Sequence, residues 1–329
     1  MIIALLMNPS LRKRLFSQRT LDRLHALGEL RYTEQAELDR AVTESLLQDA
    51  DIAITSWGSL PLDEALLDCA PDLKLIAHAA GSVKPVVTPA IYEREIPLIS
   101  SAKILSEGVS VTALGMTIAA CKDFFRLNER MHDGLWADGY SSVQELNDIT
   151  IGVAGCGYAG KHYVELLQAF DVDILVYDPG LDEDTIEAIG GKKTDLDTLL
   201  RSSDVISLHA PSIDATKHMI DRDAFAKMKD QAILINTARA SLIDTDAMVE
   251  TLESGKLKYA CIDVFDVEPA GEDNPLRRFP NCIMTPHLAG LANNGQLGIG
   301  THVLAEIDRL LNDQPLETEV TEAMLAVIA

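Results

Sequence analysis

Short apolar runs alternate with amphipathic stretches in the N-terminal part of the chain. The apolar runs are IIALLM, DIAITS, LKLIAHAAG and IPLISS, and the stretches between them, such as LFSQRTLDRLHAL, carry apolar residues at helical spacing. Alternation of this kind is typical of a parallel β-sheet covered by helices. We therefore predict an α/β layer structure for residues 1–101.

The same alternation restarts with the run ITIGVAG in the middle of the chain. It continues through DILVYD, DVISLHAP, AILINTA, YACIDVF and CIMTPHL, and helical stretches such as DTDAMVETLESG separate these runs. The pattern predicts a second parallel α/β domain, which we place at residues 102–291.

The C-terminal part of the chain carries one long helical pattern, GQLGIGTHVLAEIDRLLND, followed by a short tail. This part is too short to bury a core of its own, so we expect it to return to the first domain. The predicted fold is therefore α/β, with two Rossmann-like or flavodoxin-like parallel-sheet domains. Residues 102–291 are inserted into a discontinuous domain of residues 1–101 and 292–329. The two crossings would border a cleft, where ligands of open α/β sheets usually bind.

A glycine-rich fingerprint, GCGYAG, ends the run ITIGVAG and opens a helical stretch. In a dinucleotide site, Gly155 permits the tight turn, Gly157 lets the backbone approach a pyrophosphate, and Gly160 lets the helix pack close to the strand. Glycine-rich turns also occur for structural reasons alone. Here, however, a strand pattern precedes the fingerprint and a helical pattern follows it, so we predict a dinucleotide site.

Asp178 ends the next apolar run, DILVYD. A carboxylate at this position can accept hydrogen bonds from the hydroxyls of an adenosine ribose. The same carboxylate would repel a 2′-phosphate. NAD is therefore favoured over NADP as the cofactor.

Length and charge limit the class of protein and its partners. The 329 residues, of which 47% are hydrophobic, are enough for two globular domains. Acidic residues outnumber basic ones by 51 to 28, and the net charge of -23 would repel nucleic acids and anionic membrane surfaces. We expect neither as a partner. An anionic substrate would need cations placed locally.

Cysteine spacing and the apolar runs bear on the compartment. No close paired spacing of the kind used for zinc or dithiol chemistry is present, so we expect reduced thiols in the cytoplasm and no metal site. The cysteines are Cys69, Cys121, Cys156, Cys261 and Cys282. Basic residues follow the first apolar run rather than precede it, which is the wrong order for a signal peptide. The stretch GVSVTALGMTIAAC is interpreted as a buried helix and not as a membrane span.

Three polar residues each follow an apolar run of the second domain: Arg239, Glu268 and His287. A guanidinium can grip a carboxylate through two parallel hydrogen bonds. A carboxylate bonded to an imidazole fixes its tautomer and favours its protonated form, which can give a proton to a carbonyl oxygen as hydride arrives. Taken singly, each residue has an ordinary alternative: a capped sheet edge, a solvated loop carboxylate or a core histidine. Their order beside a nucleotide fold favours catalysis.

These motifs together resemble the D-isomer-specific 2-hydroxyacid dehydrogenase family. The similarity is strongest from Leu146 to Gly290 and rests on GCGYAG with Asp178, SDVISLHAPSIDAT, FAKMKDQAILINTARASLID, IDVFDVEP and NPLRRFPNCIMTPHLAG. L-lactate and malate dehydrogenases carry their fingerprint near the N-terminus, whereas a whole predicted domain precedes it here. The resemblance implies an NAD-dependent enzyme that interconverts a small 2-keto acid and its D-2-hydroxy acid.

The resemblance also implies roles for individual residues. Arg239 would hold the substrate's carboxylate and carbonyl, and Glu268 would pair with His287, the general acid/base. Asp263 would contact the nicotinamide carboxamide, and His209 would lie near the cofactor without a chemical duty. The cofactor-binding residues would be Gly155, Gly157, Tyr158, Ala159, Gly160, Asp178, His209, Ala210, Pro211, Thr216, Thr237, Ala238, Asp263 and His287.

The first domain departs from the family pattern. Many members bind the substrate carboxylate through the backbone amides of a glycine-containing loop that ends in aspartate. Here the loop is HAAGSVKP, with one glycine and with lysine at the usual aspartate, and the substrate-binding residues would be Ala80, Gly81, Ser82 and Lys84, with Arg239. Lys84 would add a second positive charge and suit a doubly anionic substrate. His78 and Trp57 are further candidates for specificity, with core packing as the ordinary alternative.

Two alternatives stay open at the level of the sequence. Relatives of this fold serve as NADH-sensing corepressors that retain Arg239, Glu268 and His287. Phosphite and formate dehydrogenases are also similar, but formate dehydrogenases have glutamine as the partner of the histidine, so Glu268 favours a reaction that transfers a proton. A homodimer is expected from the resemblance. The segment MHDGLWADGY, which includes Trp136, would contact the partner subunit.

Overall fold

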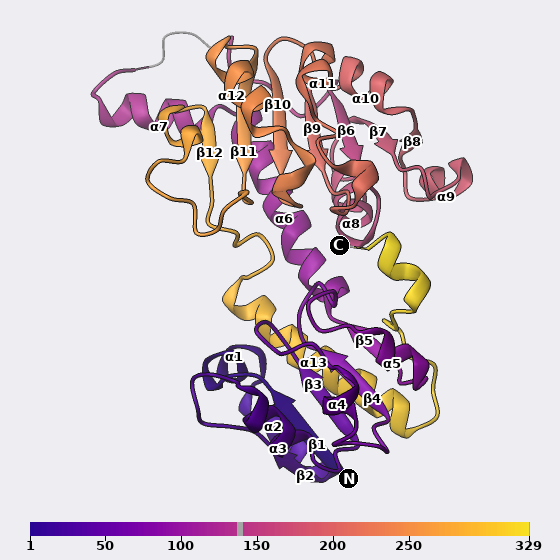
Figure 1. The fold of residues 1–329 in the computed structure, drawn as a ribbon. Coiled ribbons are helices and arrows are strands. Elements are labelled where there is room, and N and C mark those ends of the chain that lie inside the picture. Colours follow the sequence, from indigo (N-terminus) through magenta and orange to yellow (C-terminus); the bar gives the residue numbers. More distant parts are fainter. Residues whose placement is uncertain (137–140, 329) are drawn as a thin grey trace. The chain divides into compact units, whose positions relative to one another are not determined.

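The computed structural model describes residues 1–136 and 141–328 and divides into two compact units (Figure 1). Unit 1 comprises Met1–Leu105 and Leu291–Ala329, and unit 2 comprises Ser106–Gly290. Each unit contains one parallel sheet, five-stranded in unit 1 and seven-stranded in unit 2. Two parallel-sheet α/β domains are the fold class that the sequence predicts, and that prediction is confirmed.

The sheet of unit 1 has the strand order β2-β1-β3-β4-β5, and all neighbouring strands are parallel. Its strands are β1 (Ile2–Leu6), β2 (Glu29–Arg31), β3 (Ile52–Thr55), β4 (Leu75–His78) and β5 (Leu98–Ser100). Its helices are α1 (Pro9–Leu15), α2 (Gln18–Leu27), α3 (Arg40–Leu47), α4 (Glu64–Leu67), α5 (Pro89–Glu93) and α13 (Asn293–Leu311). A 3₁₀ turn, Glu322–Ala326, lies near the C-terminus.

Alternate residues of each strand in unit 1 pack on opposite faces of the sheet, because successive strand side chains point in opposite directions. Leu5 belongs to a cluster that contains Val303 of α13, whereas Leu6 belongs to a cluster that contains Leu47 of α3. The C-terminal helix therefore covers the same face of the sheet as α1 and α2.

The sheet of unit 2 has the strand order β12-β11-β10-β9-β6-β7-β8 and is also parallel. Its strands are β6 (Thr150–Ala154), β7 (Asp173–Tyr177), β8 (Lys192–Lys193), β9 (Val205–Leu208), β10 (Ala232–Asn236), β11 (Leu257–Ile262) and β12 (Cys282–Met284). The chain winds outward from β6 to β8 and then returns to begin β9 on the other side of β6. This change of direction between β6 and β9 is the point at which open α/β sheets bind ligands.

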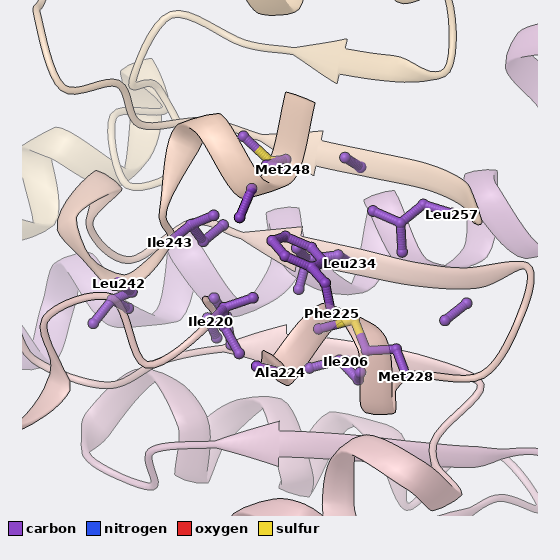
Figure 2. Packing of buried hydrophobic residues seen from close by; sticks show 14 of the residues in the cluster. Ile206, Ile220, Ala224, Phe225, Met228, Leu234, Leu242, Ile243, Met248 and Leu257 are labelled. Atoms are coloured by element: carbon purple, nitrogen blue, oxygen red, sulfur yellow. The ribbon is translucent and has the colours of Figure 1, made fainter. Parts of the chain in front are cut away.

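The helices of unit 2 cover both faces of its sheet. They are α6 (Ala102–Cys121), which begins in unit 1, α7 (Phe124–His132), α8 (Tyr158–Leu167), α9 (Glu183–Ala188), α10 (Leu196–Ser202), α11 (Arg222–Lys227) and α12 (Thr245–Glu253). Short 3₁₀ turns lie at Asp214–Thr216, Ala240–Leu242 and Pro275–Arg278. Figure 2 shows one face, where Phe225 of α11 packs with Leu234 of β10 and Met248 of α12. Ile233 and Ile235, on either side of Leu234, pack on the opposite face with α6 and α8.

Helix α6 is the one helix among the described residues that is long and apolar enough to cross a membrane. A helix in the core of a protein passes the same test, so this observation is weak evidence of a span. Ala113, Ala120 and Cys121 of α6 are fully buried in the core of unit 2. One side of α6 therefore packs in the core of unit 2, and 39% of its apolar window is buried.

Candidate active site

The glycine fingerprint forms the turn between β6 and α8. Gly155 has φ +93°, and a Cβ there would lie 2.4 Å from the amide nitrogen of Ala210. A Cβ on Gly160 would lie 2.1 Å from the carbonyl oxygen of Gly155. Real Cβ atoms do not approach other atoms this closely, so the turn and the packing of α8 against β6 both require glycine.

Gly157 is different, because nothing in the protein lies within 4 Å of the Cβ that another residue would carry. It is the N-cap of α8, and no side chain caps the first turn of this helix. The amides at a helix N-terminus favour a bound anion. The protein's own packing therefore does not require glycine at this position, whereas a pyrophosphate approaching the helix would.

Asp178 follows β7 and connects it to the fingerprint. Its Oδ2 accepts a hydrogen bond of 2.7 Å from the amide of Cys156, and its Oδ1 accepts one of 2.8 Å from the amide of Gly180. These bonds fix the direction of the carboxylate beside the glycine turn. Each oxygen has a second lone pair, with which it can accept a ribose hydroxyl.

Two buried polar atoms at the carboxyl ends of β9 and β10 have no hydrogen-bond partner among the described residues: Nδ1 of His209 and Oγ1 of Thr237. His209 bonds Ser207 Oγ through Nε2 at 2.8 Å, and its ring lies 5.1 Å from that of Tyr163. Burial lowers the pKa of His209 to about 4, so its ring is neutral near pH 7.

The remaining predicted cofactor residues lie along the same edge of the sheet. Tyr158, the first residue of α8, is exposed, and the carbonyl of Ala159 accepts a 2.8 Å hydrogen bond from Ser110 Oγ. Thr216 Oγ1 donates to the carbonyl of Pro211 at 2.5 Å and so closes the loop after β9. The loops that carry Ala210 and Ala238 follow the neighbouring strands β9 and β10.

His287 and Glu268 form a hydrogen-bonded pair at the carboxyl ends of β12 and β11. Nδ1 of His287 lies 2.6 Å from Oε2 of Glu268, and Oε1 of Glu268 accepts a 2.9 Å bond from the amide of Phe265. Burial raises the pKa of Glu268, but these two hydrogen bonds and the charges of His287 and Arg239 together outweigh burial, so the pKa lies below its usual value. The ionised carboxylate orients the ring and leaves Nε2 of His287 for exchange with a ligand.

The turn that carries His287 is held by Asp263, whose side chain is fully buried. Its carboxylate accepts hydrogen bonds from Thr285 Oγ1 at 2.5 Å, from the amide of Leu288 at 3.0 Å and from the amide of Ala289 at 2.9 Å. Its carbonyl accepts the amide of His287, whose φ is +51°. The resemblance implied a nicotinamide contact for Asp263, and spacing offered no signal for its bonds to this turn or for Thr285.

Arg239 lies at the carboxyl end of β10, where Asn236 fixes its backbone. Asn236 donates to the carbonyl of Arg239 at 2.9 Å and accepts the amide of Ala238 at 3.0 Å. The guanidinium makes one hydrogen bond within the described residues, at 2.7 Å to the carbonyl of Ala238. Burial lowers the pKa of Arg239, and the charge of Glu268 opposes this effect. A half-buried guanidinium with further donors can bind a carboxylate.

The predicted substrate loop belongs to unit 1 and follows β4. Ala80 is fully buried, Gly81 and Ser82 are half-buried, and Lys84 is exposed. His78 is buried, which lowers its pKa to about 4, and its Nδ1 lies 2.9 Å from Thr55 Oγ1. Trp57 is 38% exposed. Arg239, Glu268 and His287 thus all lie in unit 2. The predicted substrate loop lies in unit 1.

Residues 114–289 match the family model described as D-isomer specific 2-hydroxyacid dehydrogenase, NAD binding domain. The chain belongs to this family. The matched residues include the fingerprint, Asp178, Arg239, Glu268 and His287, and NAD is the cofactor of the domain. The resemblance stated from the sequence motifs is confirmed.

Curated relatives and solved structures agree with this membership. The chain is 34% identical to a glyoxylate reductase of Thermofilum pendens over 69% of each chain, and 31% identical to a D-3-phosphoglycerate dehydrogenase of Archaeoglobus fulgidus over 82% of this chain. It spans only 51% of the latter, about half its length. The structure of a D-lactate dehydrogenase from Aquifex aeolicus with NAD and lactic acid superposes with a TM-score of 0.76, at 26% identity, covering 97% and 99% of the two chains.

The residues of unit 2 fit NAD. An open position at Gly157, an uncapped helix N-terminus and the carboxylate of Asp178 lie together at the edge between β6 and β7. Thr237, with an unpartnered buried hydroxyl, follows β10 at the same end of the sheet. Among the described residues, no group of His, Cys, Asp and Glu side chains could hold a metal ion.

Replacement of Gly157 by valine tests whether this position is reserved for the cofactor. Because the protein leaves open space there, Gly157→Val should fold with a melting temperature near that of the wild type. Its side chains would occupy the approach of the pyrophosphate, so the Kd for NADH, measured by fluorescence titration, should rise at least about tenfold.

The matched control is Gly115→Val, at an exposed position of α6 that also has open space around it. We expect its Kd for NADH to equal that of the wild type. A folded Gly157→Val protein with unchanged affinity would show that the pyrophosphate does not approach this turn.

Proposed function

We propose that the protein is an NAD-dependent dehydrogenase that interconverts a small 2-keto acid and its D-2-hydroxy acid. The observation that carries this proposal is the hydrogen-bonded pair of His287 and Glu268, with the charge of Arg239 within electrostatic reach of Glu268. Relatives named glyoxylate reductase, hydroxypyruvate reductase and D-3-phosphoglycerate dehydrogenase support the substrate class.

Substrate binding is assigned to cations and amides. In the proposal, the planar guanidinium of Arg239 grips the carboxylate and the carbonyl oxygen of the keto acid. The loop amides of Ala80, Gly81 and Ser82 and the ammonium of Lys84 add further positive potential. These local cations and dipoles offset the repulsion that a net charge of -23 exerts on an anionic substrate.

Proton transfer is assigned to His287. NAD, when bound, supplies the hydride in its reduced form and accepts it in its oxidised form. As the carbonyl carbon is reduced, the protonated Nε2 of His287 gives its proton to the carbonyl oxygen, and in the oxidative direction Nε2 takes it back. Glu268 stabilises the protonated ring and, through Nδ1, fixes its tautomer. Formate oxidation needs no such proton, so the Glu268 carboxylate favours a keto-acid reaction.

The His287→Gln variant tests the acid/base assignment. Positioned proton transfer contributes about 10² to 10⁴ in rate, so kcat should fall by roughly that factor while the Kd for NADH stays unchanged. The measurement is NADH consumption with glyoxylate, hydroxypyruvate, phosphohydroxypyruvate, pyruvate and bulkier 2-keto acids. Equal loss of turnover and of NADH binding would mark His287 as a structural residue.

The Glu268→Gln variant tests the pairing, because it keeps the imidazole of His287 and a side chain of the same size beside it but removes the negative charge. Without the carboxylate, the protonated ring is less stable, so reductive activity should be lost at a lower pH than in the wild type. The pKa of Glu268 lies below its usual value. In the wild type its carboxylate therefore stays negative beside His287 at any pH above the usual pKa of a glutamate. A pH profile identical to that of the wild type would contradict the pairing.

The same panel decides between the dehydrogenase and its alternatives. Turnover of one keto acid that depends on His287 supports the proposal and identifies the substrate. NADH binding without turnover of any member would favour a corepressor-like sensor. NAD reduction by formate or phosphite would favour a formate or phosphite dehydrogenase. The structure of a formate dehydrogenase of Granulicella is similar to this one, with a TM-score of 0.74 at 26% identity.

Lys84 is proposed to select for a second negative charge on the substrate. Its ammonium is exposed, so its effect should be modest: Lys84→Ala should lower kcat/KM for phosphohydroxypyruvate about fivefold more than kcat/KM for glyoxylate. Lys192→Ala removes an exposed charge from the edge strand β8 and should change neither ratio. Unchanged relative rates in Lys84→Ala would exclude Lys84 from specificity.

A homodimer in the cytoplasm completes the proposal. Helix α7 buries none of its residues, and large apolar side chains there and just beyond it are exposed: Phe124, Met131, Leu135 and Trp136. Residues 137–140, the end of the segment expected at the partner subunit, lie outside the described residues. The five free cysteines support a reducing compartment.

Sedimentation velocity tests the dimer. Burial of an apolar face drives association, so the wild type should sediment as a dimer, and Met131→Glu and Trp136→Glu should each sediment as monomers that still bind NADH. Val327→Glu, at an exposed position of unit 1, should remain a dimer. Dimers in both α7-region variants would exclude this face as the interface.

A further inference from the structure

A chain of buried hydroxyl groups joins α6, α8 and β9 in unit 2. Thr117 Oγ1 of α6 donates to the carbonyl of Ala113 at 2.8 Å and lies 2.6 Å from the hydroxyl of Tyr163 in α8. At the other end of the chain, Ser207 Oγ of β9 lies 2.8 Å from Nε2 of His209. Thr117, Tyr163 and Ser207 are fully buried. The chain leads from the core to the carboxyl end of β9.

The chemistry of its ends fixes the direction of every hydrogen bond in this chain. A carbonyl can only accept, so the single proton of Thr117 goes to Ala113, and the hydroxyl of Tyr163 must donate to Thr117. Burial raises the pKa of Tyr163, so the hydroxyl keeps its proton, and a hydrogen bond from Ser207 opposes this effect. Ser207 thus gives its own proton to Tyr163. Its oxygen is left to accept a proton from Nε2 of His209.

His209 is therefore a neutral ring with its one proton on Nε2 and a lone pair on Nδ1. No donor for Nδ1 is present within residues 1–136 and 141–328. The hydroxyl of Thr237 also has no partner there, and the pairing of Leu208 with Asn236 places Thr237 next to His209 on the adjoining strand. Buried polar groups are nearly always hydrogen-bonded. Two unfilled groups side by side indicate a ligand from outside the chain.

His209 contacts the glycine fingerprint on both sides of its turn. Its amide donates to the carbonyl of Ala154, at the end of β6, at 2.7 Å. A Cβ on Gly155 would lie 2.6 Å from the carbonyl carbon of His209, and a Cβ on Gly160 would lie 3.3 Å from the Cβ of His209. The unfilled acceptor therefore belongs to the edge of the sheet that fits NAD. The ribose hydroxyls and the carboxamide N–H of NAD are donors that can fill it.

We propose that Tyr163 and Ser207 are positioning residues that hold His209 as the tautomer protonated on Nε2, so that Nδ1 accepts a hydrogen bond from bound NAD. The donor is a ribose hydroxyl or the carboxamide of the cofactor. Tyr163 and Ser207 act only through His209 and do not touch NAD. The inference rests on NAD as the cofactor of the domain and not on the identity of the 2-keto acid.

The Tyr163→Phe variant of the full chain tests the proposal. Without the phenol oxygen, the proton of Ser207 is free to go to Nε2 of His209, so His209 should carry its own proton on Nδ1. NMR of protein labelled with ¹⁵N-histidine shows which nitrogen is protonated, and loss of the signal in His209→Gln assigns it. The Kd for NADH, measured by fluorescence titration, should rise about three- to tenfold. A wild type with Nδ1 protonated would overturn the inference.

Tyr259→Phe is the matched control. Tyr259 is a buried tyrosine of the same unit, near the amino end of β11, and its hydroxyl donates to Asp123 Oδ1 at 2.6 Å. This variant should leave the tautomer of His209 and the Kd for NADH unchanged. An equal rise in Kd in both variants would reduce the effect to general destabilisation and overturn the inference. If Tyr163→Phe fails to fold, Ser207→Ala, which removes the acceptor of Nε2–H, should raise the Kd in the same way.

Two ligands identify the donor on the cofactor. ADP-ribose keeps the ribose hydroxyls of NADH but lacks the carboxamide. A change of the Nδ1 signal to that of a hydrogen-bonded acceptor with both ligands assigns the donor to a ribose hydroxyl, and a change with NADH alone assigns it to the carboxamide. A signal that neither ligand changes would show that NAD does not reach Nδ1 and would overturn the proposal.

These readouts separate the inference from the proposed function, because none of them uses a keto acid. If the wild type turns over none of the 2-keto acids, the proposed substrate class fails, and the NMR signal and the Kd for NADH still judge the role of Tyr163. If the wild type is an active dehydrogenase and Tyr163→Phe keeps both the tautomer and the Kd, the dehydrogenase stands and the positioning role is wrong.

Discussion

Parallel pairing of β6 with β7 on one side and with β9 on the other is the constraint on which the site in unit 2 depends. The chain must leave β6 and pass over one face, while the chain that leaves β9 passes over the other. The loop after β6 and the loop after β9 therefore start side by side at the carboxyl ends of these strands and then run to opposite faces of the sheet. Gly155, whose Cβ would collide with the loop after β9, is the residue that allows them to lie so close.

Side-chain hydrogen bonds, more than regular secondary structure, position the chemical groups beyond this edge. The carboxylate of Asp263 holds the turn that presents His287, and the side-chain amide of Asn236 holds the backbone that presents Arg239. In unit 1 the hydroxyls of Ser56 and Ser100 donate to backbone carbonyls of the loop after β4. Each donor or acceptor is buried, so water competes little for its partner.

Positive potential is local in this acidic protein. The N-terminus of α8 and a half-buried arginine supply positive potential at particular points, whereas the excess of acidic residues is spread over the chain. Burial strengthens the field of each local group, because the surrounding dielectric is lower than that of water. Net charge therefore bears on partners and solubility, and local geometry bears on the substrate.

The sequence by itself determined the two parallel α/β domains, the family and NAD as cofactor. Apolar periodicity and the glycine fingerprint are properties of short segments, so they can be recognised in the sequence without knowledge of the fold. The assigned roles of Arg239, Glu268 and His287 remain predictions, although the hydrogen bond between Glu268 and His287 is present in the structure. Only the tertiary structure decided that Gly157 has open space, that Asp263 holds the turn of His287, and that Ser100 holds the carbonyl of Gly81. The physical reason is that these contacts join residues distant in the chain, and a hydrogen bond between such residues leaves no periodic trace in the sequence.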